Sequence, residues 1–293
     1  MTDDQASSWP DRLRLGEGAR WVDGRVLLVD ILLGRLLEAT PGRTGPLREL
    51  ARCDLPLGAV APLARRAGLF LAAVGDGIAL LEPPGRLTWL ARPEAGRPGD
   101  MRMNDGVADP QGRFFAGSMD QDGAREAGRL YRVDPDGSVA VALDGLTIPN
   151  GPAFDPRAGV MYLADTAIGT IWRFRHDAGS GECSDREVFA VLDEGDGAPD
   201  GMTVDDEGRL WVALWGAGRV VCFDAGGRVA RTVPVPACQP TSVCLSPAGT
   251  PGSLWITSAA VGLDPPGADD GALFRLPVDV TAPPASAVRL EGW

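Results

Sequence analysis

The stretch APDGMTVDDEGRLWVALWGAGRVVCFD, residues 198–224, contains two strand-like runs separated by turns. The residues DDEG, 205–208, are typical of a turn. In RLWVALW, which follows, Leu210, Val212 and Leu214 alternate with residues that point to the other side, as in a β-strand. A glycine-containing turn and a second apolar run, GRVVCFD, complete the unit. The unit therefore indicates two consecutive strands joined by tight turns.

Both halves of this unit recur along the whole chain. Turn-plus-strand segments begin 41 to 50 residues apart, at Asp23, Arg65, Asp109, Asp155, Asp205 and Ser246. A segment of the second kind follows each one, beginning at Gly34, Gly77, Gly128, Gly169, Gly218 and Gly271. A period of about 45 residues with about four strands is typical of β-propellers. We therefore predict an all-β fold, a six-bladed β-propeller with four antiparallel strands per blade, as a single domain over residues 1–293.

A long β-sandwich or a pair of β domains is the competing interpretation of so many short strands. Neither accounts for two interleaved series of six segments. We expect almost no α-helix. We also expect an N-terminal strand near Arg12–Leu15 to pair with the C-terminal strands and close the ring.

Composition and charge narrow the functional classes. The chain is 44% hydrophobic and 23% charged, as globular proteins are, and its formal net charge is −12. This charge argues against nucleic acids and anionic membranes as partners, since both require a positive surface. No window approaches 18 apolar residues, and the polar N-terminus does not resemble a signal peptide. We expect a cytoplasmic protein, a monomer or weak homodimer, that acts on a small molecule.

Rare and absent residue types exclude several chemistries. All 28 basic residues are arginines, which excludes a lysine Schiff base. The one histidine, His176, is expected in an exposed loop after a strand, which disfavours histidine triads and histidine zinc sites. The five widely spaced cysteines are expected to be buried free thiols: Cys53, Cys183, Cys222, Cys238 and Cys244. Acid–base and metal-binding roles therefore fall to carboxylates, amides and arginines.

Polar residues recur at one position of the repeat. Asn104, Asn150, Asp200 and Thr241 precede their turns by five residues, Glu17 precedes its turn by six, and only the second repeat has an apolar residue, Val60. Equivalent positions of a propeller surround its axis, so we expect these side chains to converge there. Any one of them alone is an ordinary turn residue. Two converging carboxylates and two carboxamides would repel or stay unsatisfied without a cation, and their oxygens suit Ca²⁺, Mg²⁺ or Mn²⁺.

Four motifs make the chain similar to a known family. LGEGARW, MRMNDGVADPQGRFFAGSM, IPNGPAFDP and PDGMTVDDEGRLWVALWGAGRV resemble, in this order, segments of the gluconolactonase, regucalcin and senescence marker protein family. The resemblance implies a six-bladed propeller with one catalytic divalent metal ion at its centre, usually hydrolysing sugar lactones. It implies metal ligands at Glu17, Asn150 and Asp200 and substrate contacts at Arg102, Asn104 and, in the following loop, Asp122. Ca²⁺ is the expected ion, with Zn²⁺, Mn²⁺, Mg²⁺ and Fe²⁺ as alternatives.

The chain departs from the family pattern in a few places. Ala19 and Met103 stand where the family often has proline, and Asp122 stands where glutamate is common. The loop DQDGAREAG, residues 120–128, is also compact. We expect these changes to lie beside the substrate and not beside the metal, so that they affect sugar specificity.

The expected activity is that of a metal-dependent lactonase, a carboxylic ester hydrolase in which a metal-activated water attacks a lactone carbonyl. Asp200 is the candidate general base, Arg102 would hold ring oxygens or a substrate carboxylate, and Asn104 would position a hydroxyl or the water. Two alternatives remain. One is an esterase or organophosphate hydrolase on the same scaffold, which Met103 weakly favours, and the other is a non-enzymatic calcium-binding propeller.

Structural interpretations compete with these roles. Arg102 could simply form a salt bridge with Asp100 or Asp105 at a solvated turn. Asp122 could simply be a turn residue beside Gly123. Trp172, Trp211, Trp215 and Trp255 are interpreted as blade packing, and Asp165 as the cap of a strand end.

Overall fold

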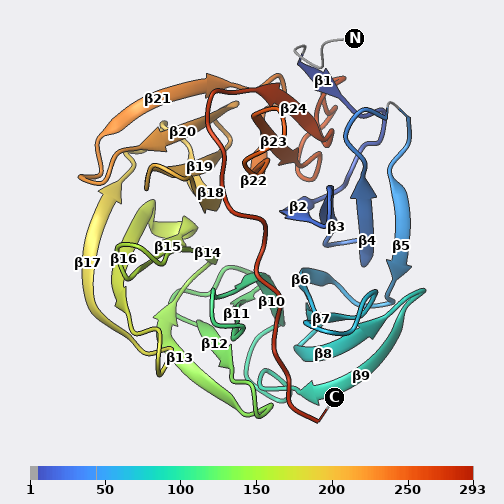
Figure 1. The fold of residues 1–293 in the computed structure, drawn as a ribbon, viewed down its shortest axis with the longest axis vertical. Helices are drawn as coiled ribbons and strands as arrows, with labels where there is room; N and C mark the ends of the chain where they lie inside the picture. Colours follow the sequence, from blue (N-terminus) through green and yellow to red (C-terminus); the bar gives the residue numbers. More distant parts are fainter. Residues whose placement is uncertain (1–5, 44, 293) are drawn as a thin grey trace.

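The backbone forms six antiparallel sheets of four strands each, arranged in a ring around a central axis (Figure 1). The computed structural model describes residues 6–43 and 45–292. Within these ranges the single helical element is a 3₁₀ turn, η1 (Thr166–Ile168), and no helix has the length and hydrophobicity that a membrane span needs. The predicted six-bladed β-propeller is confirmed, and so is the near absence of helix.

Each blade is built from four strands counted from the axis outward, and the sixth takes its outermost strand from the N-terminal segment. Blade 1 contains β2 (Gly16–Val22), β3 (Arg25–Asp30), β4 (Arg35–Ala39) and β5 (Arg48–Arg52); blade 2 contains β6 (Leu57–Pro62), β7 (Phe70–Val74), β8 (Gly77–Glu82) and β9 (Arg86–Ala91); blade 3 contains β10 (Met101–Ala108), β11 (Phe114–Asp120), β12 (Gly128–Val133) and β13 (Val139–Leu146). Blade 4 contains β14 (Pro149–Asp155), β15 (Val160–Asp165), β16 (Thr170–His176) and β17 (Cys183–Val191); blade 5 contains β18 (Ala198–Val204), β19 (Leu210–Trp215), β20 (Arg219–Phe223) and β21 (Val229–Pro234); blade 6 contains β22 (Pro240–Leu245), β23 (Ser253–Ser258), β24 (Phe274–Pro277) and β1 (Ser7–Ser8).

The N-terminal strand that closes the ring lies earlier in the chain than predicted. β1 pairs with β24 at the outer edge of blade 6, where Ser7 lies opposite Arg275. The prediction of a strand at Arg12–Leu15 is wrong, because this segment contributes only an isolated bridge between Leu15 and Ala259. The chain must travel here from the outer edge of blade 6 to the axis, where β2 begins. It therefore crosses the blade instead of running along it.

Apolar side chains fill the interfaces between neighbouring blades. In β19, Leu210, Val212 and Leu214 face blade 4, as their alternation predicts, whereas Trp211 and Ala213 face blade 6. The middle strands are apolar at nearly every position because neighbouring blades cover both of their faces. Among the described residues, one buried cluster results at each of the six interfaces.

Most residues that we expected in these cores are found there. The four tryptophans lie in or against the clusters, as predicted: Trp172, Trp211, Trp215 and Trp255. All five cysteines are free, and Cys53, Cys222 and Cys244 are buried as predicted. The prediction is wrong for Cys238, which is exposed in the connection between β21 and β22, and only partly right for Cys183 at the start of the outermost strand β17.

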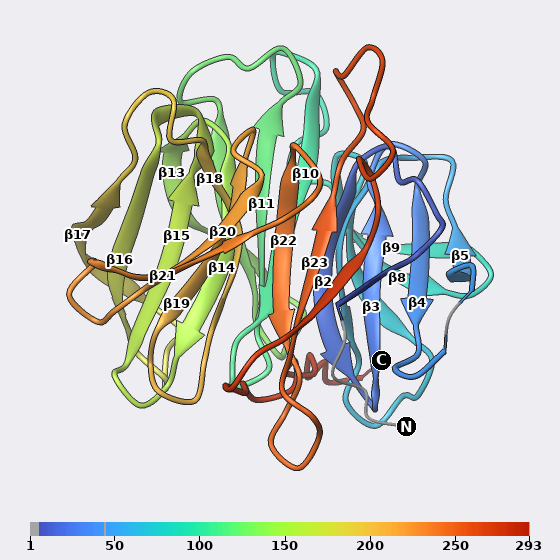
Figure 2. The same ribbon diagram turned by 90° about the horizontal axis from the view of Figure 1, so that it is seen from above.

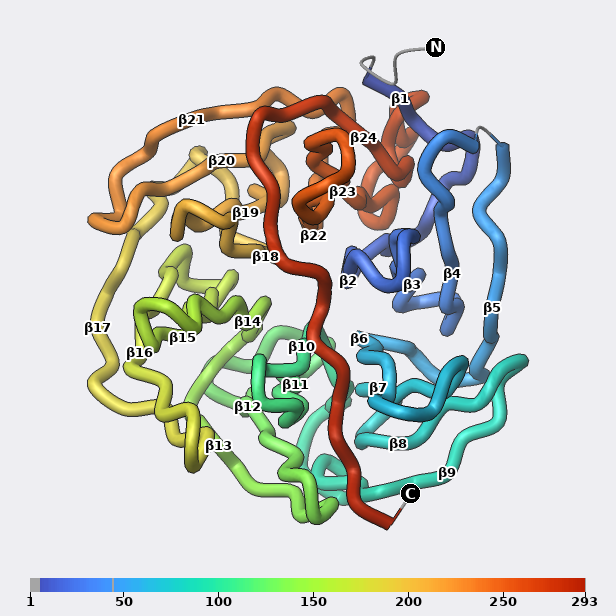
Figure 3. Tube along the Cα trace, in the orientation of Figure 1, coloured from blue at the N-terminus to red at the C-terminus, as the bar shows by residue number. Residues whose placement is uncertain are grey.

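The two faces of the ring differ in what covers them. The innermost strands begin at one face, which we call the upper face, and end at the other, the lower face; Figure 2 shows the strands running between the two. After β24 the chain crosses the centre of the ring toward blades 2 and 3 (Figure 3). We call this segment, residues 278–292, the strap.

Backbone hydrogen bonds attach the strap to the lower face of five blades. They join Asp206 N to Thr281 O (2.8 Å), Ala282 N to Ser246 O (3.2 Å), Ala285 N to Trp21 O (2.9 Å), Val288 N to Pro62 O (2.8 Å) and Arg289 N to Gly112 O (2.9 Å). A cavity of about 180 Å³ lies between strap residues 283–286 and the lower ends of the innermost strands. The strap therefore blocks approach to the axis from the lower face.

Candidate active site

Every innermost strand is interrupted by a β-bulge, which gives it one residue more than the stretch of strand that it faces. The bulges fall between Glu17 and Arg20 in β2, Leu57 and Ala59 in β6, Met103 and Gly106 in β10, Asn150 and Ala153 in β14, Pro199 and Met202 in β18, and Pro240 and Val243 in β22. A bulge re-aims side chains that would otherwise alternate between the two interblade cores. Polar residues can therefore be placed at the axis without interrupting those cores.

The bulges collect the polar residues that the repeat predicts, with one change of register. Glu17 and Asn150 directly precede their bulges, while Asn104 and Asp200 are the first residues inside theirs. The counterpart in blade 2 is Gly58, so the alignment of Val60 with this position is wrong.

Close packing at β6 explains why blade 2 has glycine at this position. A Cβ atom at Gly58 would lie 2.3 Å from the carbonyl oxygen of Asn104, so only glycine fits there. Val60 is buried in the core between blades 1 and 2. In blade 6, Thr241 has a structural role, because its hydroxyl donates to Gly16 O (2.5 Å) across the junction with blade 1.

A directed chain of hydrogen bonds links the two amides to their neighbours. Arg102 Nη1 donates to Asn104 Oδ1 (2.8 Å), and Asn104 Nδ2 donates to Asn150 Oδ1 (2.7 Å). Asn150 Nδ2 donates to Thr166 Oγ1 (2.8 Å), and the Thr166 hydroxyl donates to Pro199 O in blade 5 (2.6 Å). With both amide groups oriented in this way, Asn150 Oδ1 keeps a lone pair for a further partner. We did not predict Thr166, because nothing in the sequence near η1 signals contact with two other blades.

Two buried carboxyl groups complete the cluster. Glu17 is 4% exposed and Asp200 is 3% exposed. Burial and then the charge of Asp105 raise the pKa of Glu17 to about 8. Burial, followed by the charges of Glu17 and Asp105, raises the pKa of Asp200 well above its usual range. Burial also lowers the pKa of Arg102 to about 10, against the opposing effect of the Glu17 and Asp200 charges.

The donor set of this cluster fits a hard divalent cation. Within the described ranges, the buried Oδ1 atom of Asp200 has no hydrogen-bond partner, which is costly for a carboxylate oxygen. Glu17, Asn150 and Asp200 offer only oxygen atoms, as Ca²⁺, Mg²⁺ and Mn²⁺ prefer. Residues 6–43 and 45–292 contain no metal-binding group of three or more His, Cys, Asp or Glu side chains. The carboxamide oxygen of Asn150 would therefore complete a three-residue set with Glu17 and Asp200.

A third buried carboxylate, Asp105, belongs to the same centre and was missed as a site residue. Asp105 Oδ1 lies 3.0 Å from Arg20 Nη2, and both side chains are buried. Arg102 binds Asn104 and the Met103 carbonyl, so its proposed pairing with Asp100 or Asp105 at a solvated turn is not found. The sequence offered one signal for Asp105, which directly follows Asn104 in MNDG. A strictly alternating strand would point these two neighbours to opposite sides, so the sequence pattern did not predict that both belong to the site.

Asp122 is not brought into the cluster by any contact that the structure describes. It lies in the exposed loop after β11, on the upper face, and its backbone N–H donates to Asp120 Oδ1 (2.7 Å). This bond is of the kind that a turn residue makes. Asp165 behaves as predicted: at the end of β15, its carboxylate accepts hydrogen bonds from Thr147 N and Ile148 N, both 3.0 Å long.

Two of the departures from the family pattern lie in interblade cores and not beside a substrate. Ala19 is buried between blades 6 and 1, and Met103 is buried between blades 2 and 3. The expectation that they flank the substrate is therefore wrong for both. For Met103 the reason is the alternation of the strand, which turns its side chain away from that of Asn104.

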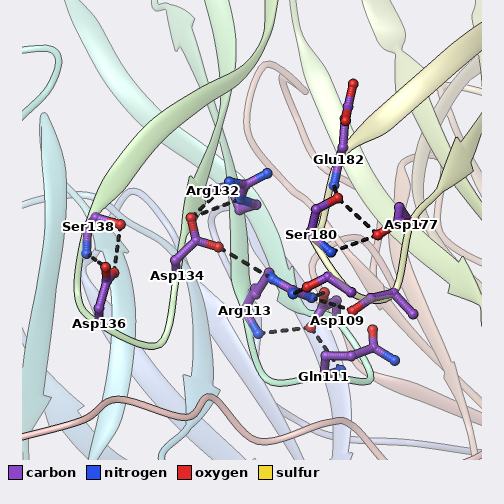
Figure 4. Close-up of polar contacts among 12 residues, drawn as sticks. Asp109, Gln111, Arg113, Arg132, Asp134, Asp136, Ser138, Asp177, Ser180 and Glu182 are labelled. Atoms are coloured by element: carbon purple, nitrogen blue, oxygen red, sulfur yellow. Dashed lines mark hydrogen bonds and ion pairs between the residues drawn. The ribbon is translucent and has the colours of Figure 1, made fainter.

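His176 is buried, contrary to the prediction of an exposed loop residue. It ends β16 at the lower face, where its ring lies 4.8 Å from that of Phe154 and its Nε2 lies 3.4 Å from Asp109. Figure 4 shows the adjoining contacts, in which Arg113 reaches from Asp109 (3.1 Å) toward Asp134 (3.4 Å). Arg113 also donates to the Ala178 carbonyl of blade 4 (3.0 Å). This network joins blades 3 and 4 at the lower face.

Together, the ring of six blades and the cluster of acids and amides define a propeller with a polar site on its axis. A family model described as SMP-30/gluconolactonase/LRE-like region matches residues 15–279. The chain belongs to this family. The family resemblance inferred from the four motifs is thereby confirmed.

Individual relatives cover nearly the whole chain. Pentonolactonase XacC from Haloferax volcanii is 38% identical over 294 residues, 94% of this chain and 96% of the relative. Regucalcin from Xenopus laevis is 32% identical over 262 residues, 86% of this chain and 85% of the relative. Among solved structures, a calcium-binding regucalcin from Agrobacterium tumefaciens has a TM-score of 0.85 at 28% identity and covers 97% of each chain. A luciferin-regenerating enzyme, with a TM-score of 0.86 at 24% identity over 98% of this chain and 100% of its own, shares the fold.

Proposed function

We propose that the protein is a divalent-metal-dependent lactonase that opens the ring of a sugar lactone or a related small lactone. The observation that carries the proposal is the buried Oδ1 atom of Asp200, which has no hydrogen-bond partner among the described residues although the charge of Glu17 is close by. The similarity to a protein named pentonolactonase, which extends over nearly its full length, supports the substrate class.

Glu17, Asn150 and Asp200 would hold the metal ion, for which Ca²⁺ is our first candidate because all three offer oxygen. The name of the calcium-binding regucalcin supports this choice. When bound, the ion would polarise the lactone carbonyl and lower the pKa of a coordinated water. The ion would add positive charge beside buried carboxylates whose charged forms burial disfavours.

Side chains of the protein would remove the proton from the attacking water and bind the substrate. Asp200 would accept a proton from the attacking water, because a carboxylate that also holds the ion would lie close to both the water and the carbonyl. Arg102 uses only Nη1 on protein atoms within the described ranges, which leaves Nε and Nη2 for ring or hydroxyl oxygens. Asn104 would position the substrate through its fixed carboxamide. Asp122 is proposed as a contact from the upper loop.

Turnover of a substrate panel with and without chelator tests this function. Aldono-lactones, a simple γ-lactone, p-nitrophenyl acetate and a phosphotriester would be assayed after chelation and after return of Ca²⁺, Mn²⁺, Zn²⁺ or Mg²⁺. We expect lactone hydrolysis that chelator abolishes and a metal ion restores. Preference for the acetate or the phosphotriester would support the esterase alternative, although burial of Met103 removes our reason for expecting it. Metal binding without turnover of any substrate would support the non-enzymatic alternative.

The variant Arg102→Ala separates substrate binding from metal binding. We expect a higher KM and slower turnover with metal content near that of the wild type, because Arg102 is proposed to contact substrate and not the ion. Loss of the metal from this variant would instead assign Arg102 a structural role.

A further inference from the structure

A buried ion pair joins two blades that are not neighbours. Arg20 of β2 in blade 1 reaches Asp105 of β10 in blade 3, with 3.0 Å between Nη2 and Oδ1 and side-chain exposures of 9% and 1%. Blade 2 lies between them, and its bulge contains Gly58, which has no side chain to obstruct the contact. Arg20 also lines the cavity above the strap, so the pair lies toward the lower side of the acid–amide cluster.

The pair also contacts the backbone beside three of the proposed site residues. Asp105 directly follows Asn104, and its Oδ2 accepts from the N–H of Gly151 (3.1 Å), which follows Asn150. Arg20 lies three residues after Glu17 and ends the same bulge. It also donates to Ala19 O (2.8 Å) and Gly106 O (3.2 Å). One ion pair therefore connects the bulges of blades 1, 3 and 4.

We propose that Asp105 and Arg20 are positioning residues that hold the bulges of β2, β10 and β14 in register, so that Glu17, Asn104 and Asn150 converge with Asp200. This inference rests on the proposed function. The hydrophobic effect that stabilises the apolar cores between blades is non-directional. Charge-assisted hydrogen bonds are directional and short, and a metal or substrate site needs its groups placed to within about 0.5 Å.

A second ion pair of the same chain provides a matched control. Arg113 and Asp109 are also buried, lie 3.1 Å apart, and accept or donate backbone bonds, but they join blades 3 and 4 at the lower face. If Asp105 and Arg20 only stabilise the fold, breaking either pair should have the same consequences. If they position the site, only their own variants should change metal binding.

The experiment measures Tb³⁺ binding to the full chain after removal of metal, with the luminescence lifetime in H₂O and D₂O as a count of coordinated waters. Arg20→Gln and Asp105→Asn are compared with Arg113→Gln and Asp109→Asn. We expect the first two to weaken Tb³⁺ binding by about 10- to 100-fold, the cost typical of lost outer-shell partners. We also expect them to gain at least one coordinated water, because a displaced protein ligand is replaced by solvent. The two controls should keep the wild-type affinity and lifetime while losing thermal stability.

Arg20→Gln is the deciding variant. It leaves Asp105 its bonds to Gly106 N and Gly151 N, so it keeps the test open should Asp105→Asn not fold. Removal of a positive charge alone should leave Tb³⁺ binding unchanged or make it tighter. Such a result, or weaker binding with an unchanged water count, overturns the inference while the proposed function stands. A wild-type protein that does not bind Tb³⁺ would overturn both.

Discussion

At the scale of single residues, Asp200 differs from the other acids in residues 6–43 and 45–292, because its Oδ1 is a buried carboxylate oxygen with no hydrogen-bond partner. The Asp200→Asn variant keeps an oxygen ligand but loses the charge and the basicity. We expect it to retain some metal with lower affinity and to lose turnover by about 10²–10⁴-fold, as enzymes do without their general base. Metal occupancy and lactone hydrolysis, both at saturating cation, are the measurements. Hydrolysis at near the wild-type rate would show that another group removes the proton.

Glu17 makes the stability of the metal-free protein depend on pH. Its pKa of about 8 lies above the ordinary value of 4.5. Between these values the folded protein binds a proton that the unfolded chain has released, so stability should fall as pH rises through this window. Unfolding midpoints in excess chelator should therefore decrease from about pH 5.5 to about pH 8. Glu17→Gln should flatten the profile, and a wild-type midpoint that rises over the same range would contradict the assignment.

At the scale of elements, the position of an acid within its strand decides its role. Asp205 follows Asp200 by five residues but lies in the turn after β18. There its Oδ1 accepts from Glu207 N and Arg209 N (both 2.9 Å), and its Oδ2 accepts from Arg209 Nε and Trp211 Nε1 (both 2.8 Å). Every acceptor site is used within its own blade. Asp205 is thus a structural residue of the turn, whereas Asp200 lies in the bulge.

The variant Asp205→Asn should therefore lose stability and keep activity. Its new amide group would face two donors of Arg209 and Trp211, which leaves buried donors unsatisfied at a cost of about 1–3 kcal/mol. Chemical denaturation and lactone turnover at a temperature below the transition check both expectations. An inactive but stable Asp205→Asn protein would contradict the division of roles between turn and bulge.

At the scale of the whole molecule, the strap ties together blades that are distant in sequence. A variant that ends at Asp279 retains all of β24 but lacks the buried side chains of Ala282 and Val288. Loss of this burial and of the strap's backbone bonds should lower Tm by about 5 °C or more. Calorimetry of this variant, beside one that ends at Glu291 and keeps the bonds, measures the effect. Equal Tm values would mean that the ring is held by its blades and by β1 alone.

The sequence by itself determined the number of blades, the strand content and the polar positions near the axis. These features are periodic, and period is a local property: the spacing of turns sets the blade, and alternation sets the two interblade faces. Glu17, Asn104, Asn150 and Asp200 could be found in this way because each lies at or directly before the bulge of its innermost strand. The family motifs added Arg102, which stands two residues before Asn104.

Tertiary structure alone decided which residues complete the site and what closes the ring. The pairing of Arg20 with Asp105 spans 85 residues, and Thr166 contacts Pro199 across 33 residues. The burial of His176 depends on Phe115 and Asp109 of blade 3, and the strap depends on the lower ends of five blades. None of these contacts repeats from blade to blade. A non-periodic contact between distant segments leaves no pattern in either of them, because each side chain acquires its partner only when the ring has closed.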